Sequence, residues 1–256
     1  MATARALLES ALRERNLDRT LTTALPPLGR TDPSALALMD VAVVDACLHG
    51  GLPRGQLSEL TGPCSSGRMT LLLQLMAAAT RRGEIAAFVD TCDRLDVASA
   101  ASAGVDLDRL LWIRLSGDQG SGIRDQGIRD QGMLDRALDR ALKALNLVLQ
   151  AGGFGMVAID LAEVPPAALR QIPLTTWPRV QRVIEGSDTA CVLLTPAPLA
   201  RSAGGLTLSL AGRSTWAGDS DRSRRLRGVD VRVRVVSPRK RIDGDVTVGT
   251  LATDIY

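Results

Sequence analysis

The sequence is poor in aromatic and metal-binding side chains. Only six of its 256 residues are aromatic: Phe88, Trp112, Phe154, Trp177, Trp216 and Tyr256. This scarcity argues against a single-strand nucleic-acid module that stacks bases on aromatic platforms. One histidine, His49, and four scattered cysteines without a C-x-x-C pair argue against a zinc site. Because unpaired cysteines suit a reducing compartment, we expect a cytoplasmic protein.

The sequence also lacks a long apolar run. No uncharged apolar run reaches the ~20 residues of a membrane-spanning helix, so we expect no membrane partner. The N-terminal stretch carries Arg5, Glu9, Arg13 and Glu14 in an amphipathic pattern, which is unlike a signal peptide. With 45% hydrophobic and 23% charged residues, the composition is that of a globular chain large enough for one α/β domain.

The net charge of +3 is small, but basic residues gather between positions 213 and 241. Ten Arg or Lys residues stand against three Asp residues in this stretch. It is either a face that binds phosphates or a solvated loop and edge strand. On the first interpretation, the candidate DNA-binding residues are Arg201, Arg222, Arg224, Arg225, Arg227, Arg239, Lys240 and Arg241.

Apolar runs typical of buried strands alternate with runs of helical spacing. Strands are expected at 56–60, 84–90, 110–115, 155–160 and 190–195, with helices between them at 71–76, 94–103, 134–149 and 174–186. This alternation predicts an α/β fold with a mostly parallel central sheet flanked by helices. The runs at 206–210, 229–236 and 246–248 alternate apolar and polar residues, which predicts a C-terminal antiparallel extension.

The same patterns divide the chain into two parts. Residues 1–45 are predicted to be an N-terminal helical segment, with one helix over 2–17 and a second over 36–48. Residues 46–256 are predicted to form the core domain. Within it, 116–132 carries a repeated Gly-Ile-Arg-Asp-Gln pentad and is expected to be a flexible insertion, and 206–256 is the β extension.

Between the first core strand and the following helix lies a phosphate-binding loop of altered chemistry. Residues 62–70 follow the frame G-x-x-x-x-G-K-[S/T], but Arg68 stands at the lysine position and Met69 at the magnesium hydroxyl. A strand, a glycine loop and a helix N-terminus together aim backbone N–H groups at a phosphate. The candidate nucleotide-binding residues are Gly62, Pro63, Cys64, Ser65, Ser66, Gly67, Arg68, Met69, Thr70 and Asp160.

Hydrolysis needs more than this loop supplies. A P-loop ATPase uses a lysine on the phosphates, a hydroxyl and an acid on Mg²⁺, and a carboxylate that positions water. Met69 offers no oxygen, and Thr70 is rotated by roughly 100° on the helix. Asp160, at a strand end, is either the magnesium acid or a buried acid capping the next turn. The loop is therefore a structural remnant, a nucleotide site without efficient hydrolysis, or a weak ATPase, and no catalytic or metal-binding residue is assigned. No cofactor is required, and ATP is expected to bind weakly at most.

Several segments resemble the RecA recombinase core in the same order. They are Gly50–Gly55, Glu59–Arg68, Ala87–Asp90, Leu95–Asp96 and Gly104–Leu111, with thinner similarity through Asp160, Thr195 and 229–236. The resemblance implies a RecA-like P-loop NTPase core. It also implies that Cys92 stands where RecA has its catalytic Glu, and Thr195 where RecA has a Gln that senses the γ-phosphate. The DNA-binding loop that follows is cut to 197–205.

These departures remove hydrolysis, ATP sensing and the DNA-contacting loops together, and the chain resembles RecA paralogues of the ImuA type. That resemblance implies an accessory protein of the DNA-damage (SOS) response and mutagenic translesion synthesis, acting mainly through protein contacts. The partners it implies are translesion polymerase-like proteins or RecA, with DNA at the basic stretch, and an oligomer is compatible with it. The alternatives are a weak DNA-dependent ATPase of the RecA family and a RecA-like cell-division inhibitor.

Overall fold

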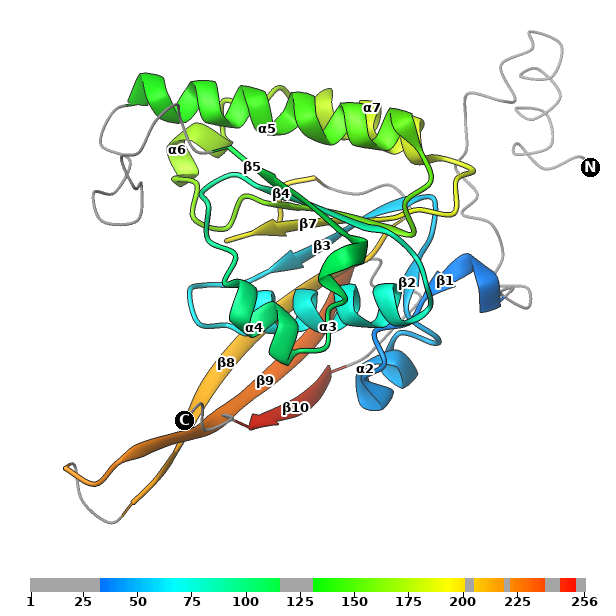
Figure 1. Cartoon of the computed structure of the whole chain (residues 1–256). Coiled ribbons are helices and arrows are strands. Elements are labelled where there is room, and N and C mark those ends of the chain that lie inside the picture. Colours follow the sequence, from blue (N-terminus) through cyan, green and yellow to red (C-terminus); the bar gives the residue numbers. More distant parts are fainter. Residues whose placement is uncertain (1–32, 116–130, 201–204, 219–221, 238–244, 252–256) are drawn as a thin grey trace, which may run out of the picture. The chain divides into compact units, whose positions relative to one another are not determined.

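The computed structural model describes residues 33–115, 131–200, 205–218, 222–237 and 245–251 (Figure 1). The chain divides into two compact units, Met1–Asp32 and Pro33–Tyr256, and the second holds every described residue. The helix expected over 2–17 and nearly all of the insertion expected over 116–132 lie outside the described residues. The domain boundary expected at residue 45 stays a prediction.

An eight-stranded sheet runs through the unit, in the order β10-β9-β8-β3-β7-β6-β4-β5. Its strands are β3 (Gln56–Thr61), β4 (Ala86–Asp90), β5 (Leu110–Arg114), β6 (Met156–Asp160), β7 (Ala190–Thr195), β8 (Thr207–Ala217), β9 (Arg225–Ser237) and β10 (Asp245–Leu251). Six neighbouring strands, from β8 to β5, are parallel, while β9 and β10 are antiparallel. The predicted α/β class with a mostly parallel sheet is thus confirmed.

The antiparallel extension begins one strand later than the sequence suggests. β8 was expected to belong to it, but Glu59–Thr61 of β3 pair in parallel with Thr207–Ser209 of β8. On its other edge β8 pairs antiparallel with β9, and β9 pairs antiparallel with β10, as the sequence predicted. As a result β3, the strand that leads into the glycine loop, is flanked on both sides by parallel strands.

Helices cover the parallel part of the sheet on both faces. On one face α2 (Ala42–Cys47), α3 (Arg68–Arg81) and α4 (Val97–Ser102) share a core, and on the other α5 (Gln131–Ala151), α6 (Pro166–Leu169) and α7 (Thr176–Ile184) share a second (Figure 1). Ala86 and Phe88 of β4 point into the first core, whereas Ala87 and Val89 point into the second. This alternation explains why the central strands read as unbroken apolar runs.

The segment before β3 differs from the helix expected over 36–48. A 3₁₀ turn, η1 (Pro33–Ala35), leads into the short strand β1 (Leu36–Ala37), which pairs with β2 (Leu52–Pro53), and only then does α2 begin. Between β4 and β5 the chain forms α4 and the 3₁₀ turn η2 (Leu107–Arg109), and Asp96 caps α4 by accepting from the Ser99 backbone N–H. Among the described helices, none combines the length and apolar character needed to span a membrane.

Candidate functional site: the glycine loop and its cavity

The glycine loop joins β3 to α3 and is packed against the β8 strand. A Cβ at Gly62 would lie 2.4 Å from the backbone oxygen of Leu210, and a Cβ at Gly212 would lie 2.1 Å from that of Ser65. Both close approaches require glycine, because real Cβ atoms do not come so near. Within the loop Ser65 has φ of 59° and Gly67 has φ of 87°, which turns the backbone into α3. The glycine pattern that predicts phosphate binding therefore also serves packing within this fold.

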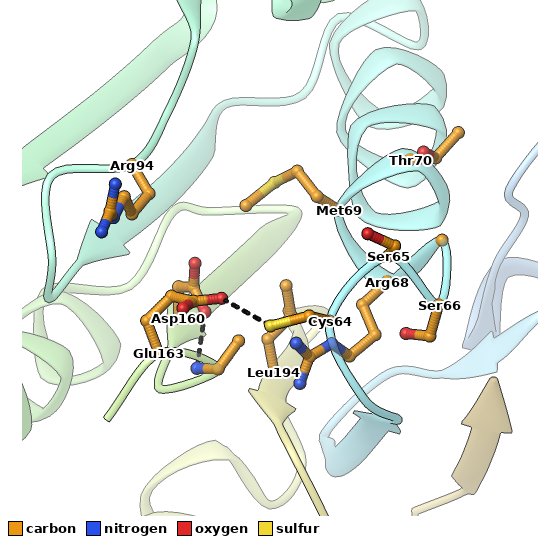
Figure 2. A pocket seen from close by; sticks show the side chains of 12 residues that line it. Cys64, Ser65, Ser66, Arg68, Met69, Thr70, Arg94, Asp160, Glu163 and Leu194 are labelled. Atoms are coloured by element: carbon orange, nitrogen blue, oxygen red, sulfur yellow. Dashed lines mark hydrogen bonds between the residues drawn. The ribbon is translucent and has the colours of Figure 1, made fainter. Parts of the chain in front are cut away.

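Beside the loop lies a cavity of about 480 Å³, a size suited to a small-molecule ligand (Figure 2). It is lined by eight of the predicted site residues, namely Cys64, Ser65, Ser66, Gly67, Arg68, Met69, Thr70 and Asp160. Gly62 and Pro63 are not among the lining residues. Sequence reasoning missed four others: Arg94, Ala162, Glu163 and Leu194. Arg94 lies four residues after Asp90, at the end of β4, and Glu163 lies three residues after Asp160, at the end of β6. Their position just after strand-end acids is the sequence signal that could have identified them as site residues.

Arg68 is committed to an internal hydrogen bond. The residue is 6% exposed, and its Nη1 donates to the backbone oxygen of Thr195, the last residue of β7, over 2.7 Å. Figure 2 shows the side chain reaching from the start of α3 to Leu194. The backbone N–H of Gly62 donates to the same oxygen over 3.2 Å. The cation that replaces the P-loop lysine thus joins the loop to the end of β7.

Asp160 lies at the same end of the sheet and is 4% exposed. Its Oδ1 accepts from the backbone N–H of Ala162 over 2.8 Å, so it caps the turn that follows β6. Burial raises the pKa of this carboxyl to about 6; Asp90 and Glu163 add to the increase, while the Ala162 N–H and Arg68 oppose it. Its part in nucleotide binding stays a prediction.

The residues present do not fit a magnesium-dependent phosphate transfer. Met69 has no oxygen to offer, and no group of three or more His, Cys, Asp or Glu within the described ranges is placed to hold a metal ion. Cys92, at the position where the resemblance implies a catalytic carboxylate, is buried, and burial together with Asp160 and Asp90 raises the pKa of its thiol to about 12. A neutral buried thiol cannot act as a base near pH 7.

Asp90, the acid at the end of β4, accepts three hydrogen bonds. Its Oδ1 accepts from the Arg94 backbone N–H, and its Oδ2 accepts from the Leu95 N–H and from Nε1 of Trp112. This carboxylate fixes the turn before α4 and leaves little capacity for another ligand.

Two residues that line the cavity also contact each other. Sγ of Cys64 donates to Oε1 of Glu163 over 3.7 Å (Figure 2).

What remains at the loop is a partial anion site. The first turn of α3, from Arg68 to Thr70, carries backbone N–H groups without intrahelical acceptors, as every helix start does. The hydroxyl of Ser66 is buried and has no hydrogen-bond partner among the described residues. Both features suit a phosphate oxygen. The geometry therefore supports phosphate contact more readily than phosphate transfer.

The predicted DNA-binding arginines fall into two groups. Arg222, Arg224, Arg225 and Arg227 are exposed just before β9 or within its first three residues, whereas Arg201, Arg239, Lys240 and Arg241 lie outside the described residues. Sequence reasoning missed Trp216, which is 52% exposed on β8 and has the Arg224 guanidinium 5.7 Å from its ring centre. On β9, Val231, Val233 and Val235 are buried while Arg232 and Arg234 are exposed, as the alternation predicts.

A parallel sheet with a glycine loop between β3 and α3, and strand-end acids beside it, defines a P-loop α/β protein. The protein-family model described as RecA N-terminal domain matches residues 28–162, just over half of the chain. The chain therefore belongs to the RecA family.

Curated relatives share part of this sequence. It is 41% identical to Protein RecA of Methylococcus capsulatus over 137 residues, which cover 53% of this chain and 33% of that protein. It is 50% identical to Protein RecA of Nitratiruptor sp. over 62 residues, 24% of this chain and 18% of that protein, and 50% identical to Protein RecA of Synechococcus elongatus over 68 residues, 27% and 19%. The chain spans from about a fifth to a third of the length of these relatives.

Proposed function

We propose that this chain is a RecA-family accessory protein of the DNA-damage response and of mutagenic translesion repair. It acts mainly through contacts with other proteins and does not hydrolyse ATP efficiently. The observation that carries the proposal is the hydrogen bond from Arg68 to the Thr195 backbone oxygen. In this bond the cation at the P-loop lysine position binds a backbone oxygen of the chain itself.

The energetics of that bond favour a non-hydrolytic role. A hydrogen bond from a buried guanidinium contributes about 1.5–3 kcal/mol to stability, and a phosphate must compete with it for the same cation. Guanidinium is also longer and more planar than the ammonium it replaces. Because Met69 and Cys92 supply neither a metal ligand nor a base, phosphate bound here would lack the groups that activate water.

Family membership supports a place in DNA repair or recombination. The resemblance to RecA paralogues of the ImuA type suggests RecA or a translesion polymerase-like protein as the partner. The partner surface, an oligomeric state and a cytoplasmic location remain part of the proposal. A cell-division inhibitor of the same family would instead bind a tubulin-like division protein.

A phosphate-release assay tests the proposal most directly. The purified chain is incubated with MgATP, with and without single-stranded DNA, beside a RecA recombinase as positive control. We expect turnover at the level of the protein-free blank. Turnover that depends on DNA and disappears in Asp160→Asn would establish the rival, a weak ATPase. In parallel, immobilised chain is offered purified RecA, the translesion polymerase homologue and the division protein separately, and binding to the last alone would favour the cell-division alternative.

A second candidate function is contact with nucleic acid along β8 and β9. The specific observation is the exposed Trp216 beside Arg224, with Arg225 and Arg227 nearby on β9. An arginine-lined strand pair with an exposed indole suits a phosphate backbone and base stacking. Fluorescence anisotropy with a labelled single-stranded oligonucleotide at two salt concentrations tests it. We expect Trp216→Ala to weaken binding by roughly tenfold, since stacking contributes about 1–3 kcal/mol per base. Leu174→Ala, at an apolar residue that is 82% exposed in the turn before α7, serves as the control.

A further inference from the structure

The glycine loop, the end of β7 and the start of β8 are joined by hydrogen bonds that the chain makes with its own atoms. The Thr195 backbone oxygen accepts from two loop donors, Nη1 of Arg68 and the N–H of Gly62. A carbonyl oxygen has two lone pairs, so these donors fill its capacity. The end of β7 is therefore bound to both ends of the glycine loop.

A buried carboxylate anchors the chain just beyond β7. Glu59 of β3 is 0% exposed, and its Oε1 accepts from the backbone N–H groups of Leu199 and Ala200, at 2.8 and 2.7 Å. Its Oε2 accepts from Oγ1 of Thr207, at the start of β8, over 3.2 Å. A buried carboxylate is tolerable only with such partners, and these three donors supply them.

The residue before it reinforces the same anchor. The hydroxyl oxygen of Ser58 accepts from the Leu206 N–H over 3.1 Å, and the Glu59 N–H donates to the Leu206 backbone oxygen over 2.7 Å. Both described ends of the β7–β8 connection are thus held by consecutive residues of β3. Because β3 leads directly into the glycine loop, the loop and the described ends of the β7–β8 connection are attached to the same strand.

We propose that Arg68 and Glu59 hold the two described ends of the β7–β8 connection, at Thr195–Ala200 and Leu206–Thr207, in one arrangement whether or not a nucleotide is present. Arg68, at the position of the phosphate-binding lysine, donates instead to the Thr195 backbone oxygen. Glu59 is the positioning residue that holds Leu199, Ala200 and Thr207 through its carboxylate. The inference rests on the proposed function, because a nucleotide-independent accessory protein needs its surface loops set without ATP.

The packing of the loop supports the same conclusion. The Ser65 backbone oxygen lies where a Cβ at Gly212 of β8 would stand, and the Leu210 oxygen lies where a Cβ at Gly62 would stand. A rearrangement of the loop on ligand binding would therefore have to move β8 as well. Close-packed contacts of this kind transmit displacement rather than absorb it.

Hydrogen exchange at three amides tests the proposal, because Gly62, Leu199 and Ala200 donate directly to Thr195 or Glu59. In the full-length wild-type chain, exchange at these amides is expected to be unchanged by millimolar MgATP. In Arg68→Lys it should accelerate by about tenfold or more, as expected when a buried charge-assisted bond is lost, and it should become sensitive to MgATP. Arg81→Lys, at the other end of α3, is the matched control and should exchange like the wild type.

Two results would overturn the inference: wild-type amides that respond to MgATP, or Arg68→Lys amides that exchange as slowly as those of Arg81→Lys. If Arg68→Lys does not fold, the wild-type measurement decides alone, and Glu59→Gln supplies a second variant, expected to accelerate Leu199 and Ala200 but not Gly62. The proposed function fails separately. Efficient ATP turnover by the wild type would refute the proposed function. If there is no turnover but the three amides in Arg68→Lys exchange at the wild-type rate, only the role of Arg68 in holding the connection is refuted.

Discussion

Val231 of β9 occupies the space beside Gly67 that a side chain would need. A Cβ at Gly67 would lie 2.4 Å from Cγ2 of Val231, and the glycine has φ of 87°. The loop residue that opens α3 and the antiparallel strand β9 are therefore fitted to one another, although they are distant in sequence.

This contact predicts a large cost for Gly67→Ala. The substitution adds a left-handed strain of about 1–2 kcal/mol and an overpacking cost of about 1–3 kcal/mol, so we expect a loss of ~3 kcal/mol in the free energy of unfolding. Chemical denaturation measures it. Gly83→Ala is the matched control, because Gly83 has φ of 84° with nothing within 4 Å of its Cβ position, and should cost only the strain. Equal losses in the two variants would refute the contact.

Arg54 is expected to be the most important arginine for stability at the opposite end of the sheet. Its Nη1 donates to the backbone oxygens of Gly155 and Asp188, and its Nη2 donates to Oε1 of Glu84 over 2.6 Å. Arg54→Ala would leave these acceptors without their donor, and we expect a loss of ~2–3 kcal/mol. The exposed pair Arg81–Asp40 is the comparison, and Arg81→Ala should cost under ~1 kcal/mol.

The same cluster predicts an acid-sensitive contribution. Burial tends to raise the pKa of Glu84, but hydrogen bonds from Arg82 and Arg54 outweigh it and leave that pKa lowered. A lowered carboxyl pKa contributes stability above the unfolded value, 4.5, which is lost as pH falls through the folded value. The difference in unfolding free energy between wild type and Glu84→Gln should therefore be largest at neutral pH and shrink in acid. A difference independent of pH would contradict this.

Asp160 predicts the opposite pH dependence. Its pKa rises from 3.8 to about 6 on folding, so the folded chain holds a proton that the unfolded chain releases between these values. Stability should therefore fall by ~3 kcal/mol as pH increases from about 4 to 6, and stay level above pH 6. Asp160→Asn keeps an oxygen for the Ala162 N–H and should remove this dependence. Denaturation at pH 5 and pH 8 measures it, with Asp139→Asn on the exposed face of α5 as control. A variant that is equally weakened at both pH values would refute the burial argument.

Three of the four cysteines should react at very different rates. Cys64 is exposed at the glycine loop, whereas Cys92 and Cys191 are buried and burial raises the pKa of each thiol to about 12. Because the thiolate is the reactive form, iodoacetamide near pH 8 should label Cys64 and leave the other two intact. Mass spectrometry of the digested protein measures the labelling, and denaturant should expose all sites. Early labelling of Cys191 in the native protein would contradict the burial described.

The sequence predicted most of the fold because the fold depends on patterns along the chain. Apolar runs separated by glycine and helical spacing placed β3, β4, β5, β6 and β7 within one or two residues. The C-terminal strands and their antiparallel pairing were predicted, but the parallel pairing of β8 with β3 was not, because alternation identifies a half-exposed strand without saying which neighbour it pairs with. The helix expected over 36–48 was wrong in its first half, where β1 pairs with β2, since a two-residue strand leaves no periodic trace.

The sequence by itself determined the altered chemistry of the glycine loop at 62–70, because the replacements at Arg68 and Met69 are differences of residue type, and residue type sets which chemistry is available. Where those side chains go was decided only by tertiary structure. The Arg68 guanidinium donates to the Thr195 backbone oxygen. The Glu59 carboxylate accepts from Leu199, Ala200 and Thr207. All of these partners are more than a hundred residues away in the chain. A guanidinium or a carboxylate has many partners within its reach, and only the packing of β3 between β7 and β8 selects these.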